Sequence, residues 1–296
     1  MSVIQEGLAW INGEFLPLEK ARVSVEDRGF QFADGIYEVI RVYDGKPFTF
    51  REHLERLKTS AFLIGIDPRM IKADFQEIGM ELISRSGIKD AELYIQITRG
   101  RAPRSHVFPK GIPPTVLISI RSVRPLPLDA EKNGISAITY PDIRWARCNI
   151  KSISLLANVL AKEEARNASA YEAIFIREGL ITEGASSNIF LLHQGVLLTP
   201  PADWRILRGI TRDILMALAI KEGIKVSQEE LKKDLIYEAE EVFITSTAIE
   251  ILPVVKVDGR VIGKGTPGST FKLLHRRFKE YVEFRIGGKN KGDEGL

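Results

Sequence analysis

The chain has 296 residues, of which 44% are hydrophobic and 27% charged, and a formal net charge of +3. Its length allows two domains with separate cores, and its interleaved charges argue against a nucleic-acid partner. A single cysteine excludes an internal disulfide, and no run approaches the roughly 18 apolar residues of a membrane helix. Because the start also lacks a secretory-signal pattern, we expect a cytoplasmic globular protein without membrane segments.

Strand and helix patterns alternate through the first part of the sequence. Two stretches of alternating apolar residues are each interrupted by Asn-Gly or Asp-Gly, the dipeptides typical of tight hairpin turns. Apolar residues at helical spacing follow. The predicted elements are hairpins at 8–18 and 37–50, helices at 51–66 and 70–86, and strands at 91–98 and 113–123.

The second part begins after a stretch rich in proline, charge and glycine, RPLPLDAEKNG, which is typical of an inter-domain connection. The mixed pattern beyond it predicts two α+β domains and argues against a doubly wound parallel sheet. The predicted elements here are strands at 135–140 and 240–246, a hairpin at 171–192, and helices at 152–167, 211–222 and 271–284. The predicted domains are 1–126 and 135–286, with a linker at 127–134 and a disordered tail at 287–296.

Lys151 lies where a strand-like run gives way to a predicted helix with Ser152 as its N-cap. The macrodipole disfavours an ammonium at a helix N-terminus, and Arg144 and Arg147 would lower the lysine pKa further if they lie close by. Lys151 is therefore a candidate for a neutral amine that attacks a carbonyl. The alternative, a solvated surface lysine, stays open.

Several positions are candidates for binding an anion. The free backbone N–H groups of Ile210 and Thr211, at the start of a predicted helix, would form an anion site. Arg56 lies at the edge of a helical apolar face and would suit a phosphate. Segment 99–106 holds three arginines and a histidine with little acidic compensation. The alternatives are a plain helix cap, an arginine that packs by its stem, and a solvated loop.

Glu183 follows a strand and is either a turn residue or an acceptor for a protonated heterocycle. The hydroxyl groups of segment 245–248, TSTA, either donate to an anion or turn the chain. No histidine has a second one at metal-ligand spacing, so we predict no metal site. A lysine, an acid, helix-terminal amides and an arginine together match the parts of a pyridoxal-phosphate site.

The order of these motifs resembles that of a known family over nearly the whole chain. The motifs are EDRGFQFADGIYEVIRVYDG, TRGRAPRSHVFP, DIRWARCNIKSISLLANVLAK, TEGASSNIF, LRGITRD and FITSTAIEILPV. They resemble those of the class IV (fold type IV) pyridoxal-phosphate aminotransferases. Within that family, Tyr37 and the Arg104-Ser105-His106 loop are similar to the D-amino-acid aminotransferases.

The resemblance implies a two-domain α+β fold, with a smaller N-terminal and a larger C-terminal domain and the cofactor pyridoxal 5'-phosphate between them. Lys151 would form the Schiff base and shuttle the proton, and Glu183 would pair with the pyridine nitrogen. Arg144 would contact the surroundings of Tyr37 and Lys151. The implied cofactor-binding residues are Lys151, Glu183, Arg56, Ile210, Thr211, Thr247, Ser187 and Leu207. The implied substrate-binding residues are Tyr37, Arg104, His106, Val39, Ser186 and Ala248.

The implied reaction is a ping-pong transfer of an amino group from a D-amino acid, such as D-alanine or D-glutamate, to a 2-oxo acid such as 2-oxoglutarate. The resemblance also implies a homodimer in which the Arg104–His106 loop reaches the partner's active site. Two alternatives on the same fold stay open, a branched-chain L-amino-acid aminotransferase and a 4-amino-4-deoxychorismate lyase. Ala248 stands where a hydroxyl residue is expected, which leaves the side-chain preference open.

Overall fold

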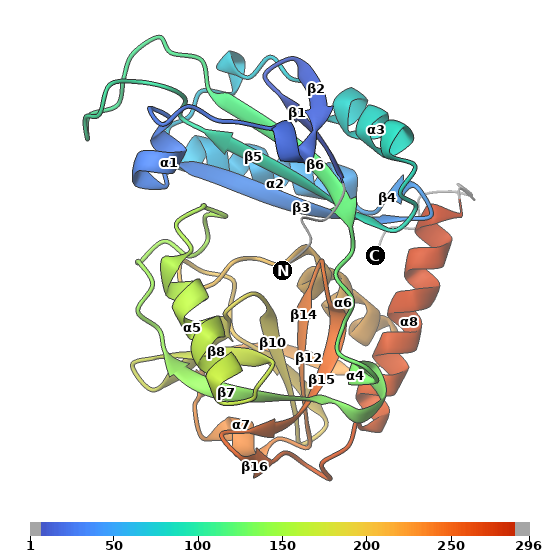
Figure 1. Cartoon of the computed structure of the whole chain (residues 1–296). Helices are drawn as coiled ribbons and strands as arrows, with labels where there is room; N and C mark the ends of the chain where they lie inside the picture. Colours follow the sequence, from blue (N-terminus) through green and yellow to red (C-terminus); the bar gives the residue numbers. More distant parts are fainter. Residues whose placement is uncertain (1–6, 288–296) are drawn as a thin grey trace. The chain divides into compact units, whose positions relative to one another are not determined.

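The structure is a computed structural model that describes residues 7–287. The chain forms two compact units (Figure 1). The first comprises the residues up to Arg124 together with Ile150–Ser154, and the second comprises Pro125–Asn149 and the chain from Leu155 onward. We retain the predicted domain limits as a proposal, but the return of Ile150–Ser154 to the first unit was not expected. The tail prediction falls beyond residue 287, outside the described residues.

A six-stranded antiparallel sheet forms the first unit, in the order β2-β1-β6-β5-β3-β4. Both predicted hairpins are confirmed, since Asn12 and Asp44 turn the chain with positive φ values of 46° and 44° ahead of their glycines. The strands are β1 (Gly7–Ile11), β2 (Glu14–Pro17), β3 (Gly35–Tyr43), β4 (Lys46–Pro47), β5 (Ala91–Thr98) and β6 (Thr115–Ser122).

The longer helices of this unit pack on its sheet, α2 on β3 and α3 on β1 and β6 (Figure 1). Alternation along β3 buries Ile36 and Ile40 in the core they share, and leaves Tyr37 and Val39 half-buried on the other face. The helix expected from residue 70 begins only at residue 75, because Asp74 accepts the first free N–H groups. The helices are α1 (Arg28–Phe32), α2 (Phe50–Leu63) and α3 (Phe75–Ser86), with 3₁₀ turns η1 (Leu18–Lys20) and η2 (Pro68–Met70).

A larger mixed sheet organises the second unit, in the order β12-β11-β10-β14-β15-β7-β8-β9-β13, with β16 on β15. The pairs β11–β12, β15–β7 and β7–β8 are parallel, and the other pairs are antiparallel. The strands are β7 (Ile135–Pro141), β8 (Glu172–Arg177), β9 (Leu180–Gly184), β10 (Asn188–His193), β11 (Val196–Thr199), β12 (Lys225–Gln228), β13 (Leu231–Lys232), β14 (Glu241–Ser246), β15 (Glu250–Val257) and β16 (Arg260–Val261). The α+β class predicted from the sequence is confirmed.

The helices of this unit are α4 (Ala130–Asn133), α5 (Leu156–Asn167), α6 (Ile210–Lys221), α7 (Leu235–Glu238) and α8 (Ser269–Ile286). The stretch predicted as a linker is not a free connection, since it contains α4, whose Ala130 is buried in the core. Gly134 closes α4 with a φ of 79°, and a Cβ on it would lie 2.3 Å from a methyl group of Val255. This stretch therefore packs against β15.

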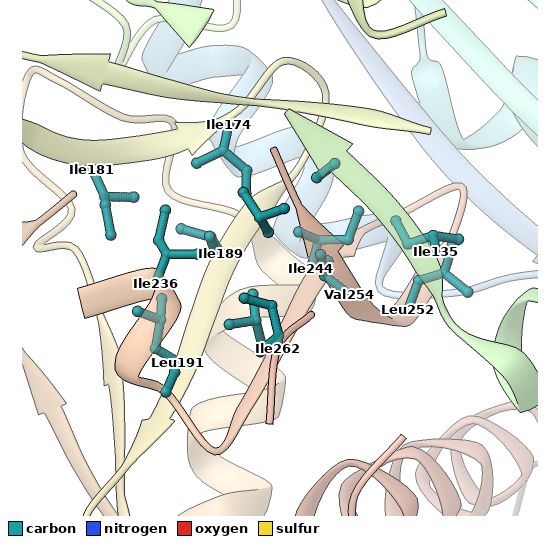
Figure 2. Packing of buried hydrophobic residues seen from close by; sticks show 14 of the residues in the cluster. Ile135, Ile174, Ile181, Ile189, Leu191, Ile236, Ile244, Leu252, Val254 and Ile262 are labelled. Atoms are coloured by element: carbon teal, nitrogen blue, oxygen red, sulfur yellow. The ribbon is translucent and has the colours of Figure 1, made fainter. Parts of the chain in front are cut away.

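Side chains from β7, β8, β9, β10, β14 and β15 converge in the core of this unit (Figure 2). On the sheet, Phe190 stacks on Phe243 with ring centroids 5.7 Å apart, and Phe243 contacts Phe271 of α8 at 6.3 Å. This packing fixes β10 and β14, the strands that lead into the candidate site. Among residues 7–287, no helix has the length and apolar character needed to span a membrane.

We predict that Glu241→Ala destabilises the fold. Both oxygens of Glu241 on β14 accept the first N–H groups of α8, from Thr270 at 3.0 Å and from Phe271 at 2.8 Å. Losing this cap leaves two donors without an acceptor and costs about 1–3 kcal/mol. Thermal unfolding should show a lower midpoint. The exposed Glu238→Ala variant is the control and should unfold like the wild type; equal midpoints for both variants would contradict the prediction.

Candidate active site

Lys151 lies in the segment Ile150–Ser154, which forms backbone hydrogen bonds with β3. Its carbonyl accepts the N–H of Tyr37 at 3.0 Å, and its own N–H donates to Ser60 Oγ of α2 at 3.3 Å. The amine Nζ stands 4.3 Å from the centroid of the Tyr37 ring. The backbone of Lys151 is therefore held by a strand and a helix, while its amine faces the ring of another predicted site residue.

The predicted helix start at Ser152 is wrong. Ser152 forms an isolated β-bridge with Ile36, and α5 begins only at Leu156, without a side-chain cap. The extended pairing of Ile150–Ser154 with β3 competes successfully with helix formation at these residues. Lys151 therefore lies outside the first turn of α5, where the helix macrodipole would disfavour an ammonium.

A buried carboxylate lies next to Tyr37 on the opposite face of β3. Glu38 is fully buried and accepts from Arg56 Nε and Nη2 at 2.6 and 2.9 Å, and His53 Nδ1 lies 2.7 Å from the same carboxylate. Burial raises the pKa of Glu38, but Arg56 and His53 outweigh it and hold the pKa at about 2. Burial also lowers the pKa of His53, so this histidine is neutral near pH 7. Arg56, the predicted phosphate ligand, is thus fixed by an ionised partner.

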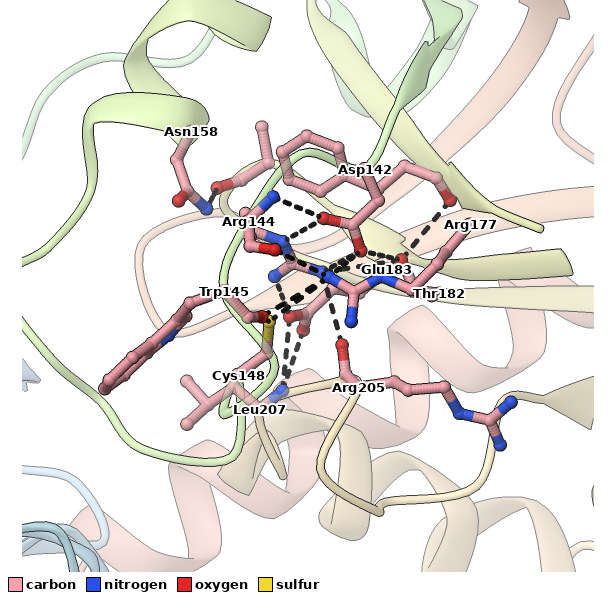
Figure 3. A network of polar contacts seen from close by, with 12 residues as sticks. Asp142, Arg144, Trp145, Cys148, Asn158, Arg177, Thr182, Glu183, Arg205 and Leu207 are labelled. Carbon is pink, nitrogen blue, oxygen red and sulfur yellow. Dashed lines mark hydrogen bonds and ion pairs between the residues drawn. The ribbon is translucent and has the colours of Figure 1, made fainter.

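Glu183, on β9, is buried and surrounded by hydrogen-bond donors (Figure 3). Arg144 Nη1 donates to Oε1, Asn188 Nδ2 donates to Oε2 at 3.1 Å, and the Leu207 N–H reaches the two oxygens at 3.2 and 3.1 Å. Burial raises the pKa of Glu183 to about 7, against the opposite effects of Arg144 and Leu207. The hydrogen bonds from Arg144 and Leu207 thus favour the ionised form of Glu183 against the effect of burial.

Arg144 joins Glu183 to a second buried acid, Asp142, at the end of β7 (Figure 3). Arg144 Nε and Nη2 each donate to Asp142 at 2.9 Å, and Arg177 of β8 lies 3.1 Å from the same carboxylate. The predicted contact of Arg144 with the surroundings of Tyr37 and Lys151 stays a prediction. Within the second unit, Arg144 pairs with Asp142 and Glu183.

The N-terminus of α6 is tied to Glu183 through Asn188. Asn188 Nδ2 donates to the Leu207 carbonyl at 2.9 Å as well as to Glu183, and a Cβ on Gly209 would lie 2.0 Å from Asn188 Oδ1. A larger residue at 209 would therefore displace the Asn188 side chain from these hydrogen bonds. The next residues, Ile210 and Thr211, open the helix without a side-chain cap, and their N–H groups have no carbonyl one turn back to receive them. This arrangement can bind a phosphate.

Glu172 organises the turn between β9 and β10. Its Oε2 accepts from Ser186 Oγ at 3.0 Å and Ser187 Oγ at 2.9 Å, and Lys162 Nζ lies 3.2 Å from Oε1. The hydroxyls of these two predicted ligands are thus already donating to a protein carboxylate. Of the other predicted turn residues, Thr247 is half-buried and Ala248 exposed, both between β14 and β15.

The basic loop divides into a buried arginine and exposed groups. Arg99 is buried and forms a bidentate pair with Asp34 at 2.7 and 2.9 Å, so its predicted role as an anion ligand is not supported. Arg28, also paired with Asp34, donates to the Ser105 carbonyl.

Arg104 and His106 are exposed and both contact the Phe32 ring, at 4.9 Å from the guanidinium carbon and 5.3 Å between ring centroids. The loop backbone is thus held by Arg28 at Ser105, while the side chains of Arg104 and His106 stay accessible to solvent.

Outside these clusters, two glutamates and a histidine lie together among the described residues. Ligand atoms of Glu131, Glu250 and His275 lie within 4.8 Å of one another. The Lys279 ammonium contacts both carboxylates, so one positive charge already compensates part of their negative charge. The prediction that the chain has no metal site stays a prediction.

Four polar residues that support the site were missed in the sequence. These are Glu38, Asp142, Glu172 and Asn188, which hold Arg56, Arg144, the serine turn and Glu183. Their position was the available signal, because each lies in or beside a strand, and Glu38 and Asn188 also adjoin a predicted site residue. A polar residue within an apolar run could have pointed to a buried partner.

Comparisons with known proteins extend the argument to the whole chain. The family model described as Amino-transferase class IV matches residues 35–257. A D-alanine aminotransferase from Bacillus licheniformis is 45% identical over 271 residues, which cover 92% of this chain and 95% of that protein. Another, from Staphylococcus haemolyticus, is 43% identical over 276 residues, covering 93% and 98%.

Solved structures agree on the fold. The branched-chain amino acid aminotransferase of Escherichia coli matches with a TM-score of 0.86 at 30% identity and covers 97% of each chain. Another branched-chain amino acid aminotransferase, from T.th. and solved with pyridoxamine 5'-phosphate, matches with a TM-score of 0.84 at 30% identity over 96% of each chain. From the matched family model, the similar sequences and the shared fold, it follows that this chain belongs to the class IV aminotransferases of fold type IV.

Proposed function

We propose that the protein is a pyridoxal-phosphate-dependent aminotransferase of D-amino acids. It moves an amino group from a donor of the D-alanine or D-glutamate type to a 2-oxo acid such as 2-oxoglutarate, in a ping-pong reaction. The observation that carries this proposal is the 41–45% identity with D-alanine aminotransferases over nearly the whole chain. Branched-chain enzymes that share the fold are only 27–30% identical.

The residues present fit the two charged ends of pyridoxal 5'-phosphate. Glu183 offers a buried carboxylate for a protonated ring nitrogen, and the uncapped start of α6 at Ile210 and Thr211 offers N–H donors for a phosphate. Asn188 packs into the space over Gly209 and links these two places. Arg56, Ser187, Leu207 and Thr247 complete the proposed set of cofactor-binding residues.

When bound, the cofactor supplies an electron-withdrawing ring that stabilises the carbanion formed at the substrate Cα. The chain supplies the proton transfer and the positioning. In the first half-reaction Lys151 Nζ would take the proton from the donor Cα and deliver it to the cofactor carbon C4′, with Tyr37 beside it. In the second half-reaction it would move a proton from C4′ to the Cα of the 2-oxo acid. Such a positioned base is worth about 10²–10⁴-fold in rate. Glu183 keeps the ring nitrogen protonated throughout.

We assign the recognition of the substrate α-carboxylate to Tyr37, Arg104 and His106. Val39, on the same face of β3 as Tyr37, and Ser186 and Ala248 would line the remaining substrate pocket. With the carboxylate held by the arginine and the histidine, the D-isomer directs its Cα–H towards Lys151.

We further propose a homodimer, in which the Arg104–His106 loop enters the partner's site. Exposed apolar side chains beside this loop, Phe30 at 73% and Val107 at 77%, support an interface there. The proposed location is the cytoplasm, which suits a chain whose single cysteine, Cys148, is free and buried.

Two alternatives on this fold predict different products. A branched-chain L-amino-acid aminotransferase would prefer L-leucine as donor, and a 4-amino-4-deoxychorismate lyase would release pyruvate without transferring an amine. A branched-chain enzyme would hold the α-carboxylate elsewhere, whereas the accessible Arg104 and His106 offer polar groups to a carboxylate at this loop.

A donor panel tests the proposed function. We expect faster amino transfer to 2-oxoglutarate from D-alanine and D-glutamate than from L-alanine, L-glutamate, L-leucine or an R-amine, measured as product formation by the full-length protein. Faster turnover of L-leucine than of D-alanine would overturn the substrate assignment. Pyruvate release from 4-amino-4-deoxychorismate without transamination would favour the lyase.

Lys151→Ala should abolish amino transfer, with a fall in kcat of at least about 10²-fold because the base is lost. The variant should still bind the cofactor, detected by equilibrium dialysis, but without the wild-type visible absorption. Lys58→Ala, which removes an exposed lysine of α2, is the control and should behave as wild type. Full turnover by Lys151→Ala would refute its catalytic role.

Arg104→Ala should raise KM for D-alanine about 10–100-fold, because a charged hydrogen bond to the α-carboxylate contributes roughly 1.5–3 kcal/mol. Cofactor affinity should not change. Arg101→Ala, in the same loop and also exposed, is the matched control and should leave KM near its wild-type value. An unchanged KM in Arg104→Ala would contradict the proposed carboxylate recognition.

A further inference from the structure

Glu183 is part of a row of buried charged side chains. Arg144 lies in the middle of this row and contacts both Glu183 and Asp142. Arg144 donates to Glu183 through Nη1, and turns Nε and Nη2 towards Asp142 at 2.9 Å each. Side-chain exposure is 7% for Arg144 and 0% for Asp142, so water screens neither contact well. Arg144 therefore divides its charge between two carboxylates.

The geometry keeps Arg144 from moving towards either acid. Its guanidinium carbon lies 4.3 Å from the centroid of the Phe175 ring, and Nη2 also donates to the Arg205 carbonyl at 3.2 Å. Thr182 Oγ1 donates to Asp142 Oδ2 at 3.0 Å, which fixes the acid on the far side. Figure 3 shows this arrangement, with Arg144 between the two carboxylates.

We propose that Asp142 and Arg144 act together as positioning residues that set the ionisation of Glu183, with Arg144 favouring the carboxylate and Asp142 limiting that effect. This inference rests on the proposed function, because an ionised Glu183 matters for holding a protonated ring nitrogen. Asp142 acts through Arg144 and has no contact with Glu183 among those described. Its role in the reaction is thus indirect.

The two residues act in opposite directions on the pKa of Glu183. Burial raises this pKa to about 7, the nearby Arg144 lowers it, and the negative Asp142 raises it. Without Arg144, Glu183 would keep its proton to a higher pH, and a protonated Glu183 cannot pair with a protonated nitrogen. Without the charge of Asp142, Arg144 would act on Glu183 alone and the proton would leave at a lower pH.

Other charged groups around Glu183 come from three elements of the unit. Arg177 on β8 compensates the negative charge of Asp142. Buried Arg212 on α6 interacts electrostatically with Glu183. Cys148, in the loop after β7, is also influenced by Glu183, although burial is the main cause that raises its thiol pKa. Arg212 is paired with Asp213 at 3.1 Å. The variants below leave all of these groups unchanged.

The test is an infrared pH titration of the full chain, which follows the protonated carboxyl band that Glu183→Gln removes. We expect a wild-type midpoint near the Glu183 pKa of about 7. The midpoint should rise by about one unit or more in Arg144→Met and fall in Asp142→Asn. Arg144→Lys retains a cation and should shift the midpoint less than Arg144→Met. A merely structural role would not move the midpoint in opposite directions.

A second readout uses the cofactor-loaded protein. The affinity for pyridoxal 5'-phosphate is measured against pH by visible absorption. The midpoint pH at which this affinity falls on acidification should rise in Arg144→Met and fall in Asp142→Asn. Arg205→Met removes an arginine whose side chain pairs with Asp203 and Glu230, and should keep the wild-type midpoint. If Arg144→Met and Asp142→Asn both retain the wild-type midpoint, or shift in the same direction, the inference is overturned. Failure of the proposed function would show separately, as wild-type protein that binds no cofactor or transfers no amine.

Discussion

The pairing of Glu183 with Arg144 is the interaction on which the second unit's part of the site depends. A carboxylate without water is stable only where donors replace its hydration, and here a guanidinium, an amide and a backbone N–H do so. The same donors come from the loop after β7, from β10 and from the segment before α6. Holding one acid in place therefore aligns the three elements that would receive the cofactor.

The first unit also contains a buried carboxylate whose lost hydration is replaced by protein side chains. Glu38 is buried on β3, the strand that pairs with the Lys151 segment, and Arg56 and His53 contact its carboxylate. In both units, a buried carboxylate on a strand is held by an arginine from another element. Alternation along β3 places Tyr37 on one face and Glu38 on the other, so the chemistry and its support are separated by the thickness of the sheet.

Local patterns in the sequence were sufficient for most elements, and they singled out Lys151 and Glu183 as candidate site residues. The hairpin turns at Asn12 and Asp44 follow from dipeptides that accept positive φ values, and strand β5 was predicted with its observed limits. Features that depend on distant residues could not be predicted. The cap of α8 comes from Glu241 on β14, and the predicted helix start at Ser152 failed because Ile36, far back in the chain, pairs with it. Pairing between distant segments leaves no local pattern.

The first unit is discontinuous, because Ile150–Ser154 belongs to it while the residues on either side belong to the second unit. A chain ending at Arg124 would contain all six strands of the first sheet but lack the segment that bonds to Gly35 and Tyr37. During synthesis, Lys151 can reach its place only after β7 has been made and the chain has turned back. The lysine thus depends on a contact that closes late, and the two units cannot be separated by a single cut without removing it.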